Sequence, residues 1–144
     1  MGRPSDHGPP QVLGFTNPDD FKAYYFKHFV HRVIFANRGS GKVRVVFTAD
    51  IWIHAFWDDG RAFDLQRAER LPWILEALED PEEILEGHTG KSEVYILTKK
   101  MWGEDFCVVI RKPNRKGVSY FITAYPPDPG TMLKIRTCNP RIWP

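Results

Sequence analysis

The chain has 144 residues, of which 42% are hydrophobic and 26% are charged. This composition is typical of one globular domain, and it excludes a collagen, a coiled coil and a wholly disordered chain. No apolar run reaches the roughly 18 residues of a membrane span, and the first residues lack the apolar stretch of a signal peptide, so we expect a cytoplasmic protein. The net charge is only +2, but residues 91–144 contain ten basic and four acidic side chains. A basic surface of this kind attracts phosphate groups.

Several common chemistries are excluded by missing motifs. The sequence has no phosphate-binding loop, no dinucleotide-binding glycine pattern and none of the usual hydrolase or metalloprotease signatures. The two cysteines, Cys107 and Cys138, lack the spacing of zinc ligands and fit a reducing compartment. We therefore expect no metal, no dinucleotide and no other cofactor.

The N-terminal part predicts an arm followed by a helix. Residues 1–14 are rich in proline and glycine, so we expect a flexible arm, with one domain over residues 15–144. The segment 17–20 reads Asn-Pro-Asp-Asp, which is typical of a helix start. The residues that follow place an aromatic stripe on one helix face, which favours core packing over a platform for nucleic-acid bases; the stripe consists of Phe21, Tyr24, Tyr25, His28 and Phe29.

The rest of the chain predicts helices followed by strands. Residues 37–41 indicate a turn, and the alternation over 42–47 indicates a strand. The aromatic and β-branched run 51–57 fits a helix or a strand, and we favour a short helix. Apolar spacing predicts a helix from Leu71 to about Asp80, a further helical turn carries Ile84 and Leu85, and four strands are expected over 93–98, 106–111, 118–125 and 132–137. These elements predict an α+β fold with N-terminal helices packed on one face of a four-stranded antiparallel sheet.

A few polar residues stand out as candidates for chemistry. His54 lies inside an apolar run, Thr123 and Tyr125 come at the end of a predicted strand, and three arginines precede the main helix, namely Arg61, Arg67 and Arg70. Histidine exchanges protons near neutral pH, and arginine binds phosphate through paired hydrogen bonds. A histidine packed in the core and arginines lying along the surface account for the same residues.

The order of these features resembles a known superfamily. The segments that carry the likeness are 51–55, the three arginines, 73–84, Tyr95 and the strand 120–126. Together they are similar to the metal-independent ribonucleases and toxins that include barnase, EndoU, the tRNA-cutting colicins and RelE, and most of all to the phage-encoded and polymorphic-toxin branch. The likeness covers residues 43–126, and it implies helices on a four-stranded antiparallel sheet with a site on the open face of the sheet.

The resemblance also implies roles for single residues. His54 matches the histidine of the family, Arg67 or Arg70 its arginine, and Thr123 with Tyr125 its late-strand polar pair. Many relatives have a second histidine shortly after the first, whereas residues 56–59 here read Phe-Trp-Asp-Asp. This departure leaves open a member that binds RNA without cutting it.

The activity implied is that of a toxin-type endoribonuclease that needs no metal, because RNA supplies its own nucleophile in the 2′-hydroxyl. His54 would move a proton, Arg67 or Arg70 would hold the phosphate, Thr123 would donate a hydrogen bond, and Tyr125 would stack on a base or donate a proton. The RNA backbone, from tRNA or mRNA, would be steered by basic side chains, namely Arg61, Lys99, Lys100, Arg111, Lys112, Arg115 and Lys116. An acidic immunity or antitoxin protein is a possible partner.

Two other classes fit the same sequence. One is an inactive RNA-binding module of phage or toxin-system origin, and the other is a protein-interaction module that uses its many aromatic side chains as an interface. Cleavage of RNA in EDTA separates the enzyme from both. Salt separates the two modules, because phosphate contacts weaken steeply with added salt and apolar contacts do not.

Overall fold

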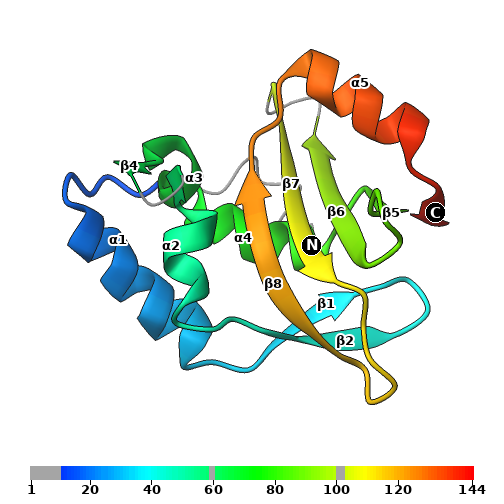
Figure 1. Cartoon of the computed structure of the whole chain (residues 1–144), viewed down its shortest axis with the longest axis horizontal. Coiled ribbons are helices and arrows are strands. Elements are labelled where there is room, and N and C mark those ends of the chain that lie inside the picture. Colours follow the sequence, from blue (N-terminus) through cyan, green and yellow to red (C-terminus); the bar gives the residue numbers. More distant parts are fainter. Residues whose placement is uncertain (1–10, 59–60, 100–102) are drawn as a thin grey trace, which may run out of the picture.

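The computed structural model describes residues 11–58, 61–99 and 103–144, with only the backbone described at Lys99. A curled seven-stranded sheet forms the centre, in the order β1-β2-β8-β7-β6-β5-β9, and β3 and β4 form a separate short hairpin (Figure 1). The strands of the large sheet are β1 (Ile34–Asn37), β2 (Lys42–Val46), β5 (Glu83–Glu86), β6 (Ser92–Lys99), β7 (Glu104–Arg111), β8 (Val118–Tyr125) and β9 (Arg141–Trp143), and the hairpin consists of β3 (Trp57–Asp58) and β4 (Ala62–Phe63).

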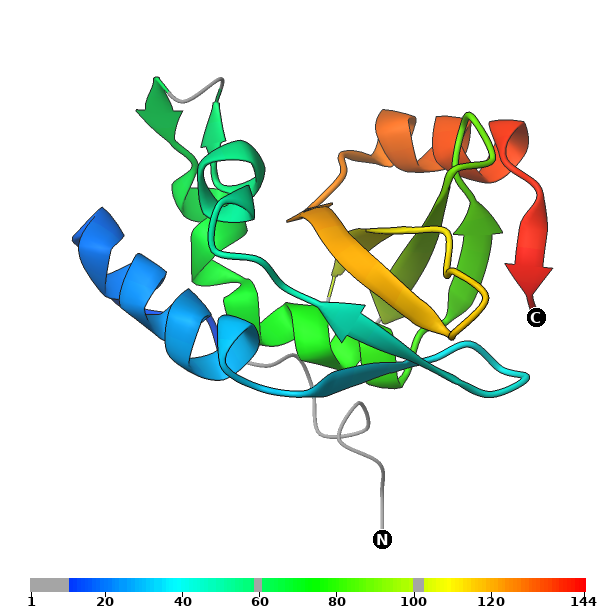
Figure 2. The same cartoon turned by 60° about the horizontal axis from the view of Figure 1, so that its bottom comes forward.

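Neighbouring strands are antiparallel except for β2 and β8, which run parallel with Val45 opposite Ser119. This pair joins the N-terminal hairpin β1–β2 to the C-terminal meander β5–β8. The sheet curls around helix α4 (Leu71–Glu79), which contacts β1, β6 and β7 (Figure 2).

Helices cover the sheet on both faces. On the concave face α4 buries an apolar stripe that includes Ile74 and Leu78, both with no exposed surface. On the other face α5 (Pro129–Cys138) packs Met132 against a second cluster with Ile96 and Cys107. Arg136 of α5 donates hydrogen bonds to Glu83 and Thr98 and so fastens the helix to the sheet.

The N-terminal helix α1 (Pro18–Tyr25) begins where the sequence predicts. The Asn17 side chain accepts a hydrogen bond from the Asp19 amide, and Pro18 occupies the first helical turn. The helix widens into a short π-helix, η2 (Phe26–Val30). The core role predicted for the aromatic stripe is confirmed, since Phe21, Tyr25 and Phe29 are almost completely buried.

Two more short helices lie between β2 and α4, namely α2 (Ile51–Ala55) and α3 (Leu65–Glu69). The helix favoured over 51–57 is therefore confirmed for 51–55. In the segment before α1, Leu13 packs against the core, and its amide donates to the Glu69 carbonyl at 2.8 Å. Residues 1–10 of the predicted arm lie outside the described residues.

The predicted four-stranded sheet is wrong. Strands β5–β8 are antiparallel neighbours, but β1, β2 and β9 extend the sheet to seven strands, and the parallel pair makes it mixed. The helices do not occupy one face only, since α5 covers the other face. The short strands β1 and β9 carry too few residues for a clear alternation, and a parallel pair leaves no turn signal in the sequence.

Two local predictions fail for identifiable reasons. The expected helical turn at Ile84 and Leu85 is strand β5, where the two side chains are buried on opposite faces of the doubly covered sheet. The expected strand 132–137 lies in α5, because Asp128 caps a helix by accepting from the Thr131 amide at 2.7 Å and Pro129 opens its first turn. The Asp-Pro pair was the missed signal, and it matches the Asn-Pro pair before α1.

The turn between β1 and β2 gives a direct test of the fold. Gly39 has φ +86°, and a Cβ atom at this position would overlap the indole ring of Trp143 in β9. We expect Gly39→Ala to lower the free energy of unfolding by well over about 1 kcal/mol, because the clash adds to the strain of a left-handed backbone. Urea denaturation measures the change.

Gly117 is the matched control, since it has φ +75° but no heavy atom within 4 Å of an added Cβ. Gly117→Ala should therefore cost only the backbone strain, about 1 kcal/mol. Equal losses in the two variants would show that the contact between Gly39 and Trp143 does not constrain the fold.

Candidate functional site

The guanidinium of Arg67 is held where α2, α3 and β8 meet. Its Nη1 donates to the Thr123 hydroxyl oxygen at 3.0 Å and to the Ala55 carbonyl at 3.4 Å, and its Nε lies 3.2 Å from an Asp64 carboxylate oxygen. The ring of Tyr125 lies under it, 5.3 Å from the guanidinium carbon. Two neighbouring helical segments and one distant strand therefore fix the orientation of one cation.

Local sequence explains why Arg67 points there. Asp64 is the N-cap of α3 and accepts a hydrogen bond from the Arg67 amide at 3.1 Å, while its second carboxylate oxygen pairs with the side chain. Contacts with described residues use Nε and Nη1 but not Nη2. Within the described ranges, then, the N–H groups of Nη2 have no protein acceptor, and such groups bind anions.

A bulge in β8 sets the direction of the two polar strand residues. Val109 pairs with Thr123 and the next residue, Ile110, pairs with Phe121, so Ile122 has no partner on β7. Phe121 and Ala124 both face the main core. Thr123 and Tyr125 therefore point to the opposite face of the sheet, toward Arg67.

The Tyr125 hydroxyl remains protonated at neutral pH. Burial raises the pKa of this phenol, the nearby Cys107 raises it further, and the Arg67 guanidinium acts in the opposite direction. Cys107 itself is buried, and burial raises the pKa of its thiol to about 12. The tyrosine can therefore give a proton, whereas the thiol is no nucleophile at neutral pH.

His54 is exposed on α2, one residue before the Ala55 carbonyl that binds Arg67. Its imidazole makes no hydrogen bond or ion pair with any residue in the described part of the chain.

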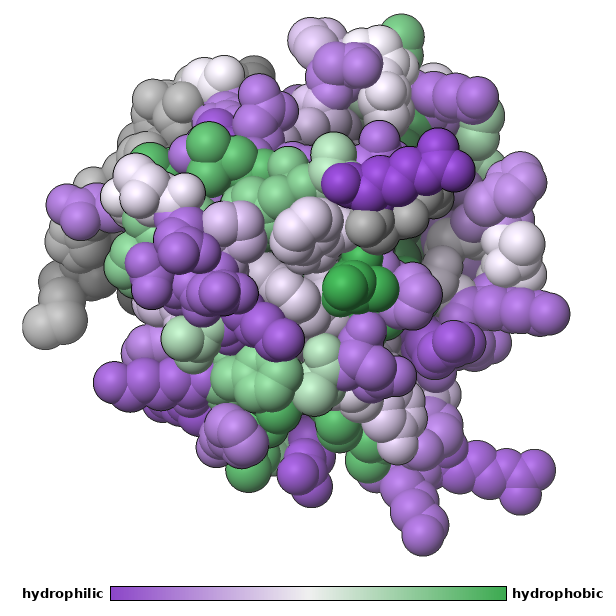
Figure 3. Space-filling model, turned by 60° about the vertical axis from the view of Figure 1, so that its left-hand side comes forward, coloured by the Kyte–Doolittle hydropathy of each residue, from purple (hydrophilic) through white to green (hydrophobic). Residues whose placement is uncertain are grey.

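Purple hydrophilic side chains surround small green and pale areas on the side of the molecule formed by α1 and α2 (Figure 3). Ile53 and Leu65, close to His54 and Arg67 in sequence, are each about half exposed.

No family, curated protein or solved structure matches this chain.

Arg70 does not join the site. Its Nε donates to Glu104 at 2.8 Å, its Nη1 donates to Glu69 at 3.0 Å and to the Gln66 carbonyl, and the guanidinium lies 5.6 Å from the ring of Trp73. Its side chain is only 15% exposed. These contacts neutralise and immobilise it, so of the two arginines left open by the sequence Arg67 is the one that meets Thr123 and Tyr125.

The basic residues predicted to steer RNA lie elsewhere. Arg111, Lys112, Arg115 and Lys116 are exposed around the β7–β8 turn, at the start of β8, whereas Thr123 and Tyr125 are at its end. A strand rises about 3.3 Å per residue, which puts the turn roughly 20 Å from the site.

Of the remaining predicted cations, Arg61 is the one whose side chain the structure describes. Arg61 is exposed at the β3–β4 turn, where its amide bonds to the Asp58 carbonyl. The Lys99 side chain and Lys100 lie outside the described residues.

Sequence reasoning missed Arg44, Asp64 and Glu104. Arg44 on β2 lies beside the basic turn, with its amide bonded to the Gly117 carbonyl at 3.0 Å. The alternation of Lys42 and Arg44 on the exposed side of the strand was the available signal. Asp64 precedes a helix, as capping residues do, but nothing local pairs Glu104 with Arg70.

Ligand groups for a metal are not gathered anywhere that the structure describes. No three histidine, cysteine, aspartate or glutamate side chains come together in the described ranges. None of the helices described is both long and apolar enough to cross a membrane.

Proposed function

We propose that this protein cleaves RNA at a phosphodiester bond without a metal ion, at the site formed by Arg67, Thr123, Tyr125 and His54. The observation that carries this proposal is the fixed Arg67 guanidinium, whose Nη2 makes no hydrogen bond within the described ranges and which lies beside a hydroxyl and a phenol. The exposed His54 directly precedes Ala55, whose carbonyl accepts from Arg67. A cation, two hydroxyl groups and a titratable base are the groups that phosphodiester transesterification needs.

The reaction begins at the ribose 2′-hydroxyl. Its oxygen forms a bond to the adjacent phosphorus while its proton passes to His54, and the bond from phosphorus to the 5′-oxygen of the next nucleotide breaks. Tyr125 donates the proton that this leaving oxygen needs. The products are a 2′,3′-cyclic phosphate and a 5′-hydroxyl end.

Arg67 and Thr123 act on the phosphate. Negative charge grows on the phosphate oxygens as the new bond forms, and the Nη2 groups of Arg67 bind these oxygens more strongly at that stage than before. The Thr123 hydroxyl accepts from Arg67, so its own hydrogen is free to donate to a phosphate oxygen. DNA lacks the 2′-hydroxyl and is not cleaved by this route.

The test is incubation of the purified protein with total tRNA and with a long mRNA in excess EDTA. We expect 2′,3′-cyclic phosphate ends from the unchanged protein and a rate at least about 100-fold lower from His54→Ala, since proton transfer contributes that much. His88→Ala is the matched control, because His88 is an exposed histidine in the β5–β6 turn.

Each result has a definite meaning. Equal cleavage by His54→Ala and the unchanged protein would remove His54 from the mechanism. If RNA binds without being cut, and its affinity falls steeply with added salt, the protein is an RNA-binding module and not a nuclease. RNA with 2′-O-methyl groups should bind and remain uncut; its cleavage would contradict attack by the 2′-hydroxyl.

A further inference from the structure

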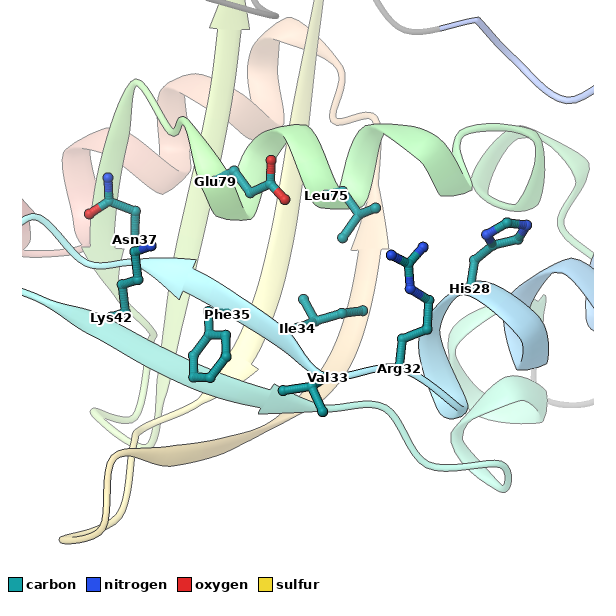
Figure 4. A pocket seen from close by; sticks show the side chains of 9 residues that line it. All are labelled: His28, Arg32, Val33, Ile34, Phe35, Asn37, Lys42, Leu75 and Glu79. Carbon is teal, nitrogen blue, oxygen red and sulfur yellow. The ribbon is translucent and has the colours of Figure 1, made fainter.

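Strand β1 is an edge of the large sheet, and a pocket of about 440 Å³ opens beside it. Figure 4 shows this pocket between β1 and α4, with Leu75 and Glu79 reaching down from the helix. His28 and Arg32 lie at one end, and Asn37 and Lys42 at the other. The pocket is separate from the site at Arg67 and shares no residue with it.

The backbone of β1 has groups to offer along this edge. Along an antiparallel strand, the backbone N–H and C=O groups of every second residue bond to the partner strand, and those of the residues between point away from it. The Arg38 amide donates to the Gly41 carbonyl at 2.8 Å. Counting back from Arg38 in steps of two, the backbone groups of Ala36 and Ile34 are the ones that bond to β2. The N–H and C=O groups of Phe35 and Asn37 then point outward, and among the described residues no partner for them is found.

The side chains along this edge are apolar in the middle and positive at the ends. Val33 is 63% exposed and Phe35 is 48% exposed, which is high for large apolar residues. Neither Arg32 nor Lys42 forms an ion pair within the described part of the chain. Glu79 is the single carboxylate among the residues that line the pocket.

From this arrangement we infer that β1 binds an extended, acidic segment of a partner protein, which adds a strand to the sheet in the groove between β1 and α4. Main-chain hydrogen bonds to Phe35 and Asn37 give the affinity, and alternate side chains of the segment give the specificity. Carboxylates of the segment pair with Arg32 and Lys42. An unprotected apolar edge of this kind otherwise promotes aggregation.

Charge argues against a second copy of this chain as the occupant. Antiparallel pairing of two β1 strands about Phe35 would place Arg32 opposite Arg38 of the second copy at both ends, and the charge of Arg38 is already paired with Glu93. A second copy therefore offers no carboxylate to Arg32 at this position. An acidic strand does.

The probe is a fluorescein-labelled heptapeptide of alternating glutamate and valine, compared with one in which lysine replaces glutamate. We expect the acidic peptide to bind the full-length protein and to slow hydrogen exchange at the Phe35 and Asn37 amides, and the basic peptide to do neither. Methylation of alternate peptide nitrogens should abolish binding, because it removes the main-chain donors without any change in the protein.

Two protein variants complete the test. Arg32→Glu should weaken binding of the acidic peptide at least roughly tenfold, the effect of losing one charged contact. Phe35→Pro removes one outward N–H and should also weaken it, while Leu133→Thr, an exposed apolar residue on α5, should leave binding unchanged.

Three results would overturn the inference. The first is equal binding of the acidic and basic peptides, and the second is a lack of protection at Phe35 and Asn37. The third is a dimer, seen by sedimentation, that Phe35→Pro dissociates, since the edge would then be occupied by a second copy.

Discussion

Replacement of Arg38 by alanine is expected to lower the free energy of unfolding by about 3 kcal/mol. Glu93 on β6 is 1% exposed, and Arg38 neutralises it through hydrogen bonds of 2.7–3.2 Å from Nε and Nη2. Without the arginine an uncompensated carboxylate stays inside the protein. This loss of stability is at the lower end of the range for breaking a buried ion pair, because the Arg38 side chain is 32% exposed.

The measurement is urea denaturation, which leaves electrostatic interactions unscreened. Arg38→Ala combined with Glu93→Gln should recover part of the loss, because the second change removes the buried charge. Arg136→Ala is the control, since it breaks a similar pair with Glu83 near the surface and should cost less than about 1 kcal/mol. A loss no larger than that of the control would mean that solvent reaches Glu93 when Arg38 is absent.

Arg67→Ala is expected to reduce RNA cleavage about 100-fold or more, a loss on the order of 3 kcal/mol in transition-state stabilisation. Arg67→Lys should retain part of the rate, because it keeps a positive charge but loses the paired donors. The effect should fall mainly on kcat, since the contact strengthens as charge develops on the phosphate.

Arg67 also ties α2, α3 and β8 together, so its structural role must be separated from its role in cleavage. Melting curves of each variant give the folded fraction at the assay temperature, and the rate is expressed per folded molecule. Arg141→Ala, an exposed arginine on β9, should cleave like the unchanged protein. A rate per folded molecule that Arg67→Ala leaves intact would make Arg67 a structural residue only.

The sequence predicts the elements whose signals are local. The Asn-Pro start of α1, the apolar spacing of α4 and the alternation in β6, β7 and β8 all depend on neighbouring residues, and each prediction is confirmed. Strand β5 was misread because both of its faces are buried, which removes the alternation that marks a half-exposed strand. The parallel contact of β2 with β8 depends on the closing of the sheet and has no local signature.

The candidate site, too, could be predicted from the sequence only in part. The sequence names Arg67, Thr123 and Tyr125 as candidates, and the structure brings these three side chains into contact. It does not distinguish Arg67 from Arg70, because only the folded chain brings Glu104 to Arg70. The distance of the basic turn from the site could have been derived from the sequence, because the predicted strand 118–125 separates the turn from Thr123 and Tyr125.

The parallel pair of β2 and β8 also affects how the chain folds. Val45 and Ser119 are separated by about half of the sequence, so a long loop must close before they meet. The β5–β8 meander contains mostly short-range contacts and should form early, while the β1–β2 hairpin waits for β8. Val43, Val45 and Phe47 are buried in the folded chain, so we expect them to be exposed in this half-assembled state and aggregation to start from it.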